Sequence, residues 1–195
     1  MKLLGLTGGI GMGKSTAVEI LRAEGCQVVD TDVIGRELVK PGEPALKEIE
    51  RTFGASYVGP GGELRRRDLA ELVFSNSKAK LGLESILHPR IRAAWLEKVA
   101  NWRSAQVTVG VVVIPLLFET GAEAEFDGII SVACAKKTQT ARLMERGWNV
   151  GEIERRNASQ ISSEEKMNRA DWVVWTEGSM NGHQKQLKRI LAVAA

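Results

Sequence analysis

The chain has 195 residues, of which 44% are hydrophobic and 26% charged, a composition that excludes a disordered or fibrous protein. Lysine and arginine number 27 against 24 for aspartate and glutamate, and the resulting net charge of +3 is too small to indicate a nucleic-acid-binding protein. No apolar stretch is long enough for a signal peptide or for the roughly 20 residues of a membrane span, so we expect a cytoplasmic protein without a membrane partner.

The first 30 residues predict a strand, a helix and a second strand. Residues 2–6 are short, apolar and followed by glycines, which is typical of a strand buried on both faces. A helix is predicted from Lys14, with one apolar stripe made of Ala17, Val18, Ile20 and Leu21. The second strand follows at residues 27–30. Because such a crossover makes the two strands parallel, Asp30 and Asp32 are expected at the edge of the sheet where both strands end.

Three further runs rich in β-branched residues, 109–114, 128–133 and 172–175, complete a predicted five-stranded parallel sheet. Between the second and third strands, residues 40–104 form a polar segment that is far longer than an ordinary crossover. This length predicts an inserted helical subdomain. A thiol in or beside an apolar segment is usually buried, and this prediction applies to Cys26 and Cys134.

A second polar insertion, residues 136–169, joins the fourth and fifth strands and is rich in arginine. Its pattern predicts two helices, at 138–146 and 152–160. The expected fold is therefore α/β, with a core made of residues 1–39 and 105–195 that includes this second insertion, and a helical subdomain at 40–104.

A glycine-rich loop carries the strongest chemical signal. The sequence GGIGMGKS at residues 8–15 matches G-x-x-x-x-G-K-[ST] at every fixed position and lies between a predicted strand and a predicted helix, so it is a P-loop. Main-chain N–H groups of such a loop bind phosphate oxygens, Lys14 reaches the terminal phosphates, and the Ser15 hydroxyl can ligate Mg²⁺. The predicted nucleotide-binding residues in the loop and the start of the helix are Gly8, Gly9, Gly11, Met12, Gly13, Lys14, Ser15 and Thr16.

Two other nucleotide-binding patterns fit the sequence less well than a P-loop of a small-molecule kinase. A dinucleotide-binding fingerprint would suit the acidic residues at 30 and 32, but the glycines are spaced wrongly for it and a lysine opens the helix. A GTPase would suit D-x-x-G at 32–35, but that motif comes too soon after the loop and no N-K-x-D segment follows. A small-molecule kinase that binds a nucleoside triphosphate fits better. In such a kinase Asp32 can orient the acceptor hydroxyl or take its proton, although it could instead cap the helix predicted at 33–39.

Four segments, at residues 5–15, 30–36, 87–91 and 115–119, resemble in order successive motifs of the dephospho-CoA kinase family. Residues 139–146, 156–160 and 166–171 are similar to the lid and final strand of that family. The resemblance implies the P-loop kinase fold, with a helical substrate-binding insertion and a helical lid at about 136–169. It implies ATP-dependent phosphorylation of the ribose 3′-hydroxyl of dephospho-coenzyme A, the last step of CoA synthesis, with ATP and Mg²⁺.

The resemblance also implies roles for single residues. Asp32, Lys14 and Arg142 would be catalytic, and Arg142 and Arg146 would close over the phosphates of ATP. The residues implied around dephospho-CoA are Asp32, Arg66, His88, Leu116 and Glu119.

Several alternatives stay open at this point. His88 could simply fix a turn before Pro89, and the lid arginines could form salt bridges with interleaved glutamates on a solvated surface. A nucleoside or nucleotide kinase of the same fold, or a nucleotide-binding regulator without catalysis, would carry the same loop. The oligomeric state is not predicted.

Overall fold

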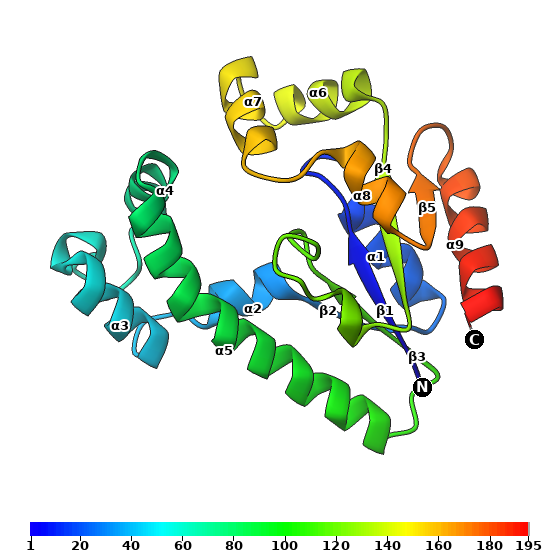
Figure 1. Ribbon diagram of the computed structural model, residues 1–195, viewed down its shortest axis with the longest axis horizontal. Coiled ribbons are helices and arrows are strands. Elements are labelled where there is room, and N and C mark those ends of the chain that lie inside the picture. The colour runs from blue at the N-terminus through cyan, green and yellow to red at the C-terminus, as the bar shows by residue number, and fades with distance from the viewer. Residues whose placement is uncertain (195) are drawn as a thin grey trace. The chain divides into compact units, whose positions relative to one another are not determined.

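The computed structural model describes residues 1–194 and contains a five-stranded parallel sheet with the strand order β2-β3-β1-β4-β5 (Figure 1). The predicted strands are confirmed as β1 (Lys2–Thr7), β2 (Gln27–Asp30), β3 (Val109–Val113), β4 (Gly128–Ala133) and β5 (Trp172–Trp175). Every residue of β3 and β4 is buried, as expected for parallel strands covered on both faces. Within the described part of the chain, no helix is both long and apolar enough to cross a membrane.

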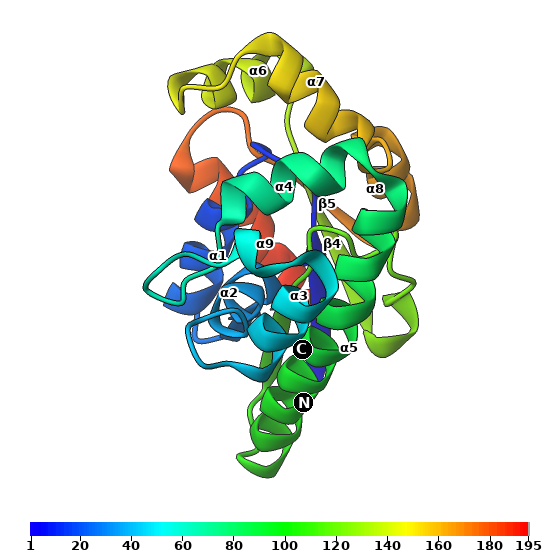
Figure 2. The same ribbon diagram turned by 90° about the vertical axis from the view of Figure 1, so that its left-hand side faces the viewer.

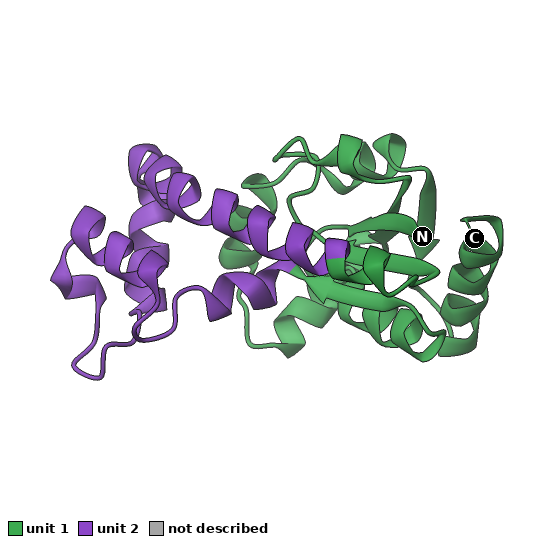
Figure 3. Ribbon diagram, turned by 90° about the horizontal axis from the view of Figure 1, so that it is seen from below, with its two compact units in different colours: residues 1–30, 101–195 green, residues 31–100 purple. Residues whose placement is uncertain are grey.

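The chain divides into two compact units (Figure 3). The first contains residues 1–30 and the chain from residue 101 onward, and the second contains residues 31–100. The predicted insertion began at residue 40, whereas the second unit begins at α2 (Thr31–Glu37). The reason lies in the contacts of α2: Gly35 packs against Ile91, and the carbonyl of Arg36 accepts a hydrogen bond from Arg66.

The first unit has a core between the sheet and the helices α1 (Lys14–Ala23) and α9 (Met180–Ala194). Leu21, Val111, Ile130 and Leu187 are completely buried in it. The connection between β4 and β5 forms α6 (Lys136–Glu145) and α7 (Val150–Ala158), which lie beyond the carboxyl ends of the strands in Figures 1 and 2. A short 3₁₀ helix, η2 (Glu123–Glu125), precedes β4.

The connection also contains a third helix, α8 (Ser163–Arg169), which the two predicted helices did not include. Its start is fixed by Ser162, whose side chain accepts a hydrogen bond from the N–H of Glu165. A serine followed three residues later by a glutamate is the signature of a helix amino terminus, so the signal was present in the sequence.

The second unit consists of α2, α3 (Pro44–Phe53), the 3₁₀ helix η1 (Ala55–Tyr57), α4 (Arg66–Ser75) and most of α5 (Ser77–Ser104). It has a hydrophobic cluster of its own, made of Val39, Ala45, Ile49, Leu69 and Ile86.

The turn considered before Pro89 is wrong, because this proline lies inside α5. Proline lacks the N–H that would continue the helical hydrogen bonding and normally bends or breaks a helix. The carbonyl that loses its helical donor at Pro89 is that of Ser85, four residues earlier. The Arg90 side chain donates from Nη1 to the neighbouring carbonyl of Ile86 at 2.6 Å. Arg90 also forms an ion pair with Glu48 of α3.

Candidate functional site

The glycine-rich loop connects β1 to α1 at the carboxyl edge of the sheet (Figure 1). Three of its glycines, Gly8, Gly11 and Gly13, have φ angles of 142°, 74° and 100°, which side chains rarely adopt. At Gly8 a Cβ atom would lie 2.4 Å from the carbonyl oxygen of Val132 in β4. Only glycine therefore allows the loop to pass this close to the neighbouring strand.

The helix that follows the loop starts without a side-chain cap, since Gly13 occupies the N-cap position. The amino end of a helix carries a partial positive charge and favours anions. Lys14 adds a full charge, and its Nζ donates to the carbonyl oxygens of Gly8 and Gly9 at 2.8 Å and 3.0 Å. The loop, the amino end of the helix and the ammonium group together form a site that favours binding of phosphate oxygens. Ser15 and Thr16 belong to the first turn of α1.

Side chains to which the sequence assigned no role hold the loop in place. Gln139 of α6 is buried, and its Nε2 donates to the carbonyl of Ile10 at 2.7 Å. The Thr176 hydroxyl donates to the carbonyl of Met12 at 2.8 Å. The N–H and Sγ of Cys134 approach the Met12 sulfur at 3.3 Å and 3.4 Å. Two carbonyl groups of the loop are thus bonded to α6 and to the residue that follows β5.

Both cysteines are free and buried, as predicted. Burial raises the pKa of Cys134 above its usual value, which keeps the thiol protonated. Burial likewise raises the pKa of Cys26.

Arg142 of α6 lies beside the same framework. Its Nη1 donates to the Thr176 hydroxyl oxygen at 3.0 Å, and its Nη2 donates to the Thr176 carbonyl at 2.7 Å. Arg146 is exposed and follows the last residue of α6. The alternative in which arginines of this segment form salt bridges with nearby glutamates holds for Arg156, which pairs with Glu152 at 3.0 Å and lies over the Trp148 ring. It does not hold for Arg142, whose guanidinium donates to Thr176.

Glu177 and His183 have perturbed pKa values near Arg142. The Thr138 hydroxyl and the Ala135 N–H both donate to Oε1 of Glu177, and these bonds hold its pKa below the usual value. His183 is buried, and its Nε2 has no hydrogen-bond partner among the described residues. Burial and, to a smaller extent, the positive charge of Arg142 lower the pKa of His183.

The segment that leaves β3 carries Leu116 and Glu119, two of the residues implied at the acceptor. Leu116 is half-buried. Oε1 of Glu119 pairs with Nζ of Lys166 at 2.9 Å and accepts a hydrogen bond from the N–H of Ile161 at 3.1 Å. The carboxylate therefore has partners within the protein.

The other three residues implied at the acceptor belong to the second unit. Asp32 is the second residue of α2, directly after β2, so it lies within the first turn of the helix instead of capping a helix that begins at residue 33. Arg66, the first residue of α4, donates from Nη2 to the Arg36 carbonyl at 3.1 Å and is thereby attached to the helix that carries Asp32. His88 is half-buried within α5.

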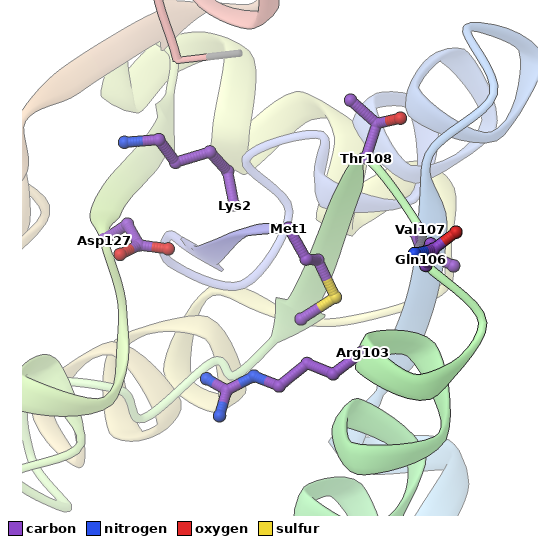
Figure 4. A pocket seen from close by; sticks show the side chains of 7 residues that line it. All are labelled: Met1, Lys2, Arg103, Gln106, Val107, Thr108 and Asp127. Carbon is purple, nitrogen blue, oxygen red and sulfur yellow. The ribbon is translucent and has the colours of Figure 1, made fainter.

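A cavity of about 700 Å³ lies at the opposite edge of the sheet, where β1, β3 and β4 begin (Figure 4). Its lining consists of Met1, Lys2, Arg103, Gln106, Val107, Thr108 and Asp127. None of the predicted site residues belongs to this lining. The chemistry indicated by the loop is therefore at the other end of the strands.

Comparison with known proteins gives the family directly. The family described as Dephospho-CoA kinase matches residues 2–182. The dephospho-CoA kinase of Anaeromyxobacter dehalogenans is 42% identical over 193 residues, which cover 98% of this chain and 92% of that protein. That of Bdellovibrio bacteriovorus is 40% identical and covers 98% and 95% of the two chains.

Solved structures agree with this. A Thermus thermophilus protein is 34% identical with a TM-score of 0.87, covering 100% of this chain and 98% of its own. The dephospho-CoA kinase of Campylobacter jejuni is 28% identical with a TM-score of 0.72, covering 98% and 96%. A shikimate kinase of Bacteroides thetaiotaomicron, at 14% identity and a TM-score of 0.53, shares the fold alone.

Proposed function

The chain belongs to the dephospho-CoA kinase family, and from that premise we propose that it transfers the γ-phosphoryl group of ATP to the ribose 3′-hydroxyl of dephospho-CoA. The observation that carries this proposal is the family match over residues 2–182, which includes the P-loop between β1 and α1. The reaction is a phosphotransfer to an alcohol acceptor.

Phosphoryl transfer depends on positioning the two substrates and on neutralising charge on the group in transit. We assign the first task to the loop of residues 8–13 and to the amino end of α1, which would hold the phosphates of ATP. Lys14 would exchange its bonds to the Gly8 and Gly9 carbonyls for oxygens of the terminal phosphates. Because these bonds are made to neutral acceptors, an anionic phosphate would compete for the ammonium group effectively.

Mg²⁺ fits the residues at the start of α1. The Ser15 hydroxyl is a hard oxygen donor, and Mg²⁺ in such sites takes few protein ligands because phosphates and water supply the rest. When bound, the ion would neutralise phosphate charge.

On the acceptor side, Asp32 would orient the ribose hydroxyl or accept its proton. Its position, two residues beyond the end of β2, is where ligand-binding residues of parallel sheets occur. The other proposed acceptor-binding residues are Arg66, His88, Leu116 and Glu119. We propose that residues 40–104, most of which fall in the second unit, form the CoA-binding subdomain.

The lid role of α6 is also a proposal. Arg142 would exchange its two bonds to Thr176 for the phosphates when ATP binds, and Arg146 would approach from the end of the same helix. Guanidinium groups suit this task because they carry several donors in a fixed plane.

The proposal is tested by incubating purified protein with Mg·ATP and a panel of acceptors: dephospho-CoA, nucleosides and nucleoside monophosphates. CoA should form, with a kcat/KM for dephospho-CoA at least about 100-fold above that for any other acceptor. Faster phosphorylation of a nucleoside or nucleotide would mean that the protein is a nucleoside or nucleotide kinase of the same fold. ATP binding without any transfer would indicate a regulator.

A further inference from the structure

Lys166 of α8 is completely buried, with an exposed fraction of 0%. Its Nζ lies 2.9 Å from Oε1 of Glu119 and donates to the carbonyl oxygen of Pro115 at 2.5 Å. Removing an ammonium group from water is strongly unfavourable, and an apolar side chain of similar size often stabilises a protein as well as a buried ion pair does. Stability alone therefore does not account for a charge at this position.

The two partners of Lys166 connect it to the phosphate loop and to the connection between α7 and α8. The Pro115 carbonyl also accepts a hydrogen bond from the Thr7 hydroxyl at 3.2 Å, and Thr7 is the last residue before Gly8. Oε1 of Glu119 also accepts from the N–H of Ile161, in the connection between α7 and α8. One ammonium group thus connects the exit of β3, the start of the phosphate loop and the connection between α7 and α8, all within the first unit.

The helix that carries Lys166 also touches the loop directly. A Cβ atom at Gly9 would lie 3.1 Å from Oγ of Ser163, the first residue of α8. At the other end of α8, the Arg169 guanidinium lies 4.5 Å from the centroid of the Phe118 ring. Helix α8 is therefore packed between the loop and residues 115–119, with Lys166 at the centre of the contact.

We propose that Lys166 is a positioning residue for phosphoryl transfer, because it fixes residues 115–119 relative to the phosphate loop through Pro115 and Glu119. The inference rests on the proposed function, in which Leu116 and Glu119 lie at the acceptor. A displacement of about 1 Å between reacting groups is enough to lower a rate by about 100-fold. Loss of the ammonium group should affect transfer more than ATP binding, since the loop and Lys14 are unchanged.

The first test is Lys166→Met, which keeps an unbranched apolar side chain one atom shorter and removes the charge. We expect kcat with dephospho-CoA to fall at least about 10-fold, whereas the Kd of the unreactive analogue AMP-PNP, measured by calorimetry, changes less than about 3-fold. A lower unfolding midpoint with kcat per folded molecule unchanged would mean a purely structural role and would overturn the proposal.

Glu119→Gln provides a second route if Lys166→Met does not fold. The glutamine keeps an oxygen for the Ile161 N–H and the ammonium group but removes the negative charge, and we expect a similar loss of kcat at near-normal AMP-PNP affinity. When both substitutions can be combined, the double variant should lose little more than either single one, because the pair acts as a unit. Losses that multiply, or an unchanged kcat in Glu119→Gln, would contradict the pair's positioning role.

The matched control is Lys188→Met, which removes the lysine of an ion pair with Glu24 at 3.3 Å whose lysine side chain is 53% exposed. It should leave kcat unchanged. An unmodified protein that fails to phosphorylate dephospho-CoA would overturn the proposed function and this inference together. An active unmodified protein and an equally active Lys166→Met variant would overturn this inference alone.

Discussion

Asp32 combines two properties at the scale of a single residue. It opens α2, where an acidic side chain interacts favourably with the helix dipole, and it follows β2 at the edge of the sheet to which the phosphate loop also belongs. The first property stabilises the fold and the second suits work on a substrate hydroxyl. Substitution by asparagine keeps the size and a hydrogen-bonding oxygen, but it removes both the charge that interacts with the dipole and the ability to accept a proton. A control at another first-turn aspartate therefore tells the two losses apart.

We expect Asp32→Asn to lower kcat by about 100-fold or more, with little change in the Kd of AMP-PNP. Steady-state kinetics with dephospho-CoA and calorimetry with AMP-PNP provide the two measurements. Asp68→Asn is the control, because Asp68 occupies the corresponding first turn of α4 and has no proposed role. Near-normal turnover in Asp32→Asn would assign Asp32 to helix stability alone.

His183 should make the stability of the protein depend on pH. Burial and Arg142 lower the pKa of His183, so the folded protein keeps it neutral where the unfolded chain, with a pKa near 6.5, already binds a proton. The unfolded state then binds more protons, and the free energy of unfolding must fall as the pH decreases below about 6.5. One such group changes the free energy of unfolding by at most about 1.4 kcal/mol per pH unit.

Thermal unfolding between pH 7.5 and pH 5 measures this dependence. His183→Gln should show a flatter dependence than the unsubstituted protein. If the slopes of the two proteins agree, His183 does not titrate with folding.

The residues that sequence reasoning found and those it missed differ in a physical way. Spacing within one short segment predicts the loop from Gly8 to Ser15, because its chemistry is carried by neighbours in the chain. Gln139, Thr176 and Lys166 act on partners that are 129, 164 and 51 positions away. No local pattern carries such pairings, so the side chains that hold the loop and the exit of β3 became visible only with the fold.

At the scale of elements, the central strands β1, β3 and β4 were predictable because burial on both faces requires continuous apolar runs. The edge strands β2 and β5 keep exposed residues. The helices were predictable where glycines or caps mark their ends, and α8 was missed although Ser162 marks its start. The turn expected before Pro89 was wrong because α5 continues through the proline. Local propensity does not predict this, since a proline inside a helix is disfavoured.

The phosphate loop, as an element, allows a direct test of its close approach to β4. Gly8→Ala would place a Cβ atom 2.4 Å from the Val132 carbonyl oxygen, so loop or strand must move. We expect a loss of about 2 kcal/mol or more in the free energy of unfolding, and AMP-PNP binding too weak for calorimetry. Chemical denaturation and calorimetry would measure the two effects.

Gly25→Ala is the matched control for this prediction. Gly25 also has a positive φ, 85°, but nothing lies within 4 Å of the position of its Cβ. Gly25→Ala should lower the free energy of unfolding by only about 1 kcal/mol, because alanine disfavours a positive φ, and it should leave AMP-PNP binding intact. Equal losses in the two variants would mean that φ, and not the contact with Val132, determines the effect at Gly8.

At the scale of the whole molecule, the two units have hydrophobic clusters drawn from different parts of the chain. The cluster around the sheet includes Leu187 and takes its members from the first unit, whereas the cluster around Ile49 takes its members from residues 31–100. The length of the insertion predicted a separate subdomain. Its start at Thr31 was not predictable, because the assignment of α2 depends on tertiary contacts with Ile91 and Arg66.

The separate clusters predict that damage to one unit can be told apart from damage to the other. Ile49→Ala removes a fully buried side chain from the second unit and should cost about 2–5 kcal/mol of that unit's stability. If residues 40–104 bind CoA, the KM for dephospho-CoA should rise at temperatures where the first unit stays folded, while the Kd of AMP-PNP changes less than about 3-fold.

Leu187→Ala is the matched control, because it creates a cavity of similar size in the first unit. It should weaken AMP-PNP binding instead, because it loosens the packing under α1. Calorimetry with AMP-PNP and kinetics with dephospho-CoA on both variants decide the matter: if Ile49→Ala weakens nucleotide binding as much as Leu187→Ala does, the two units do not divide the substrates between them.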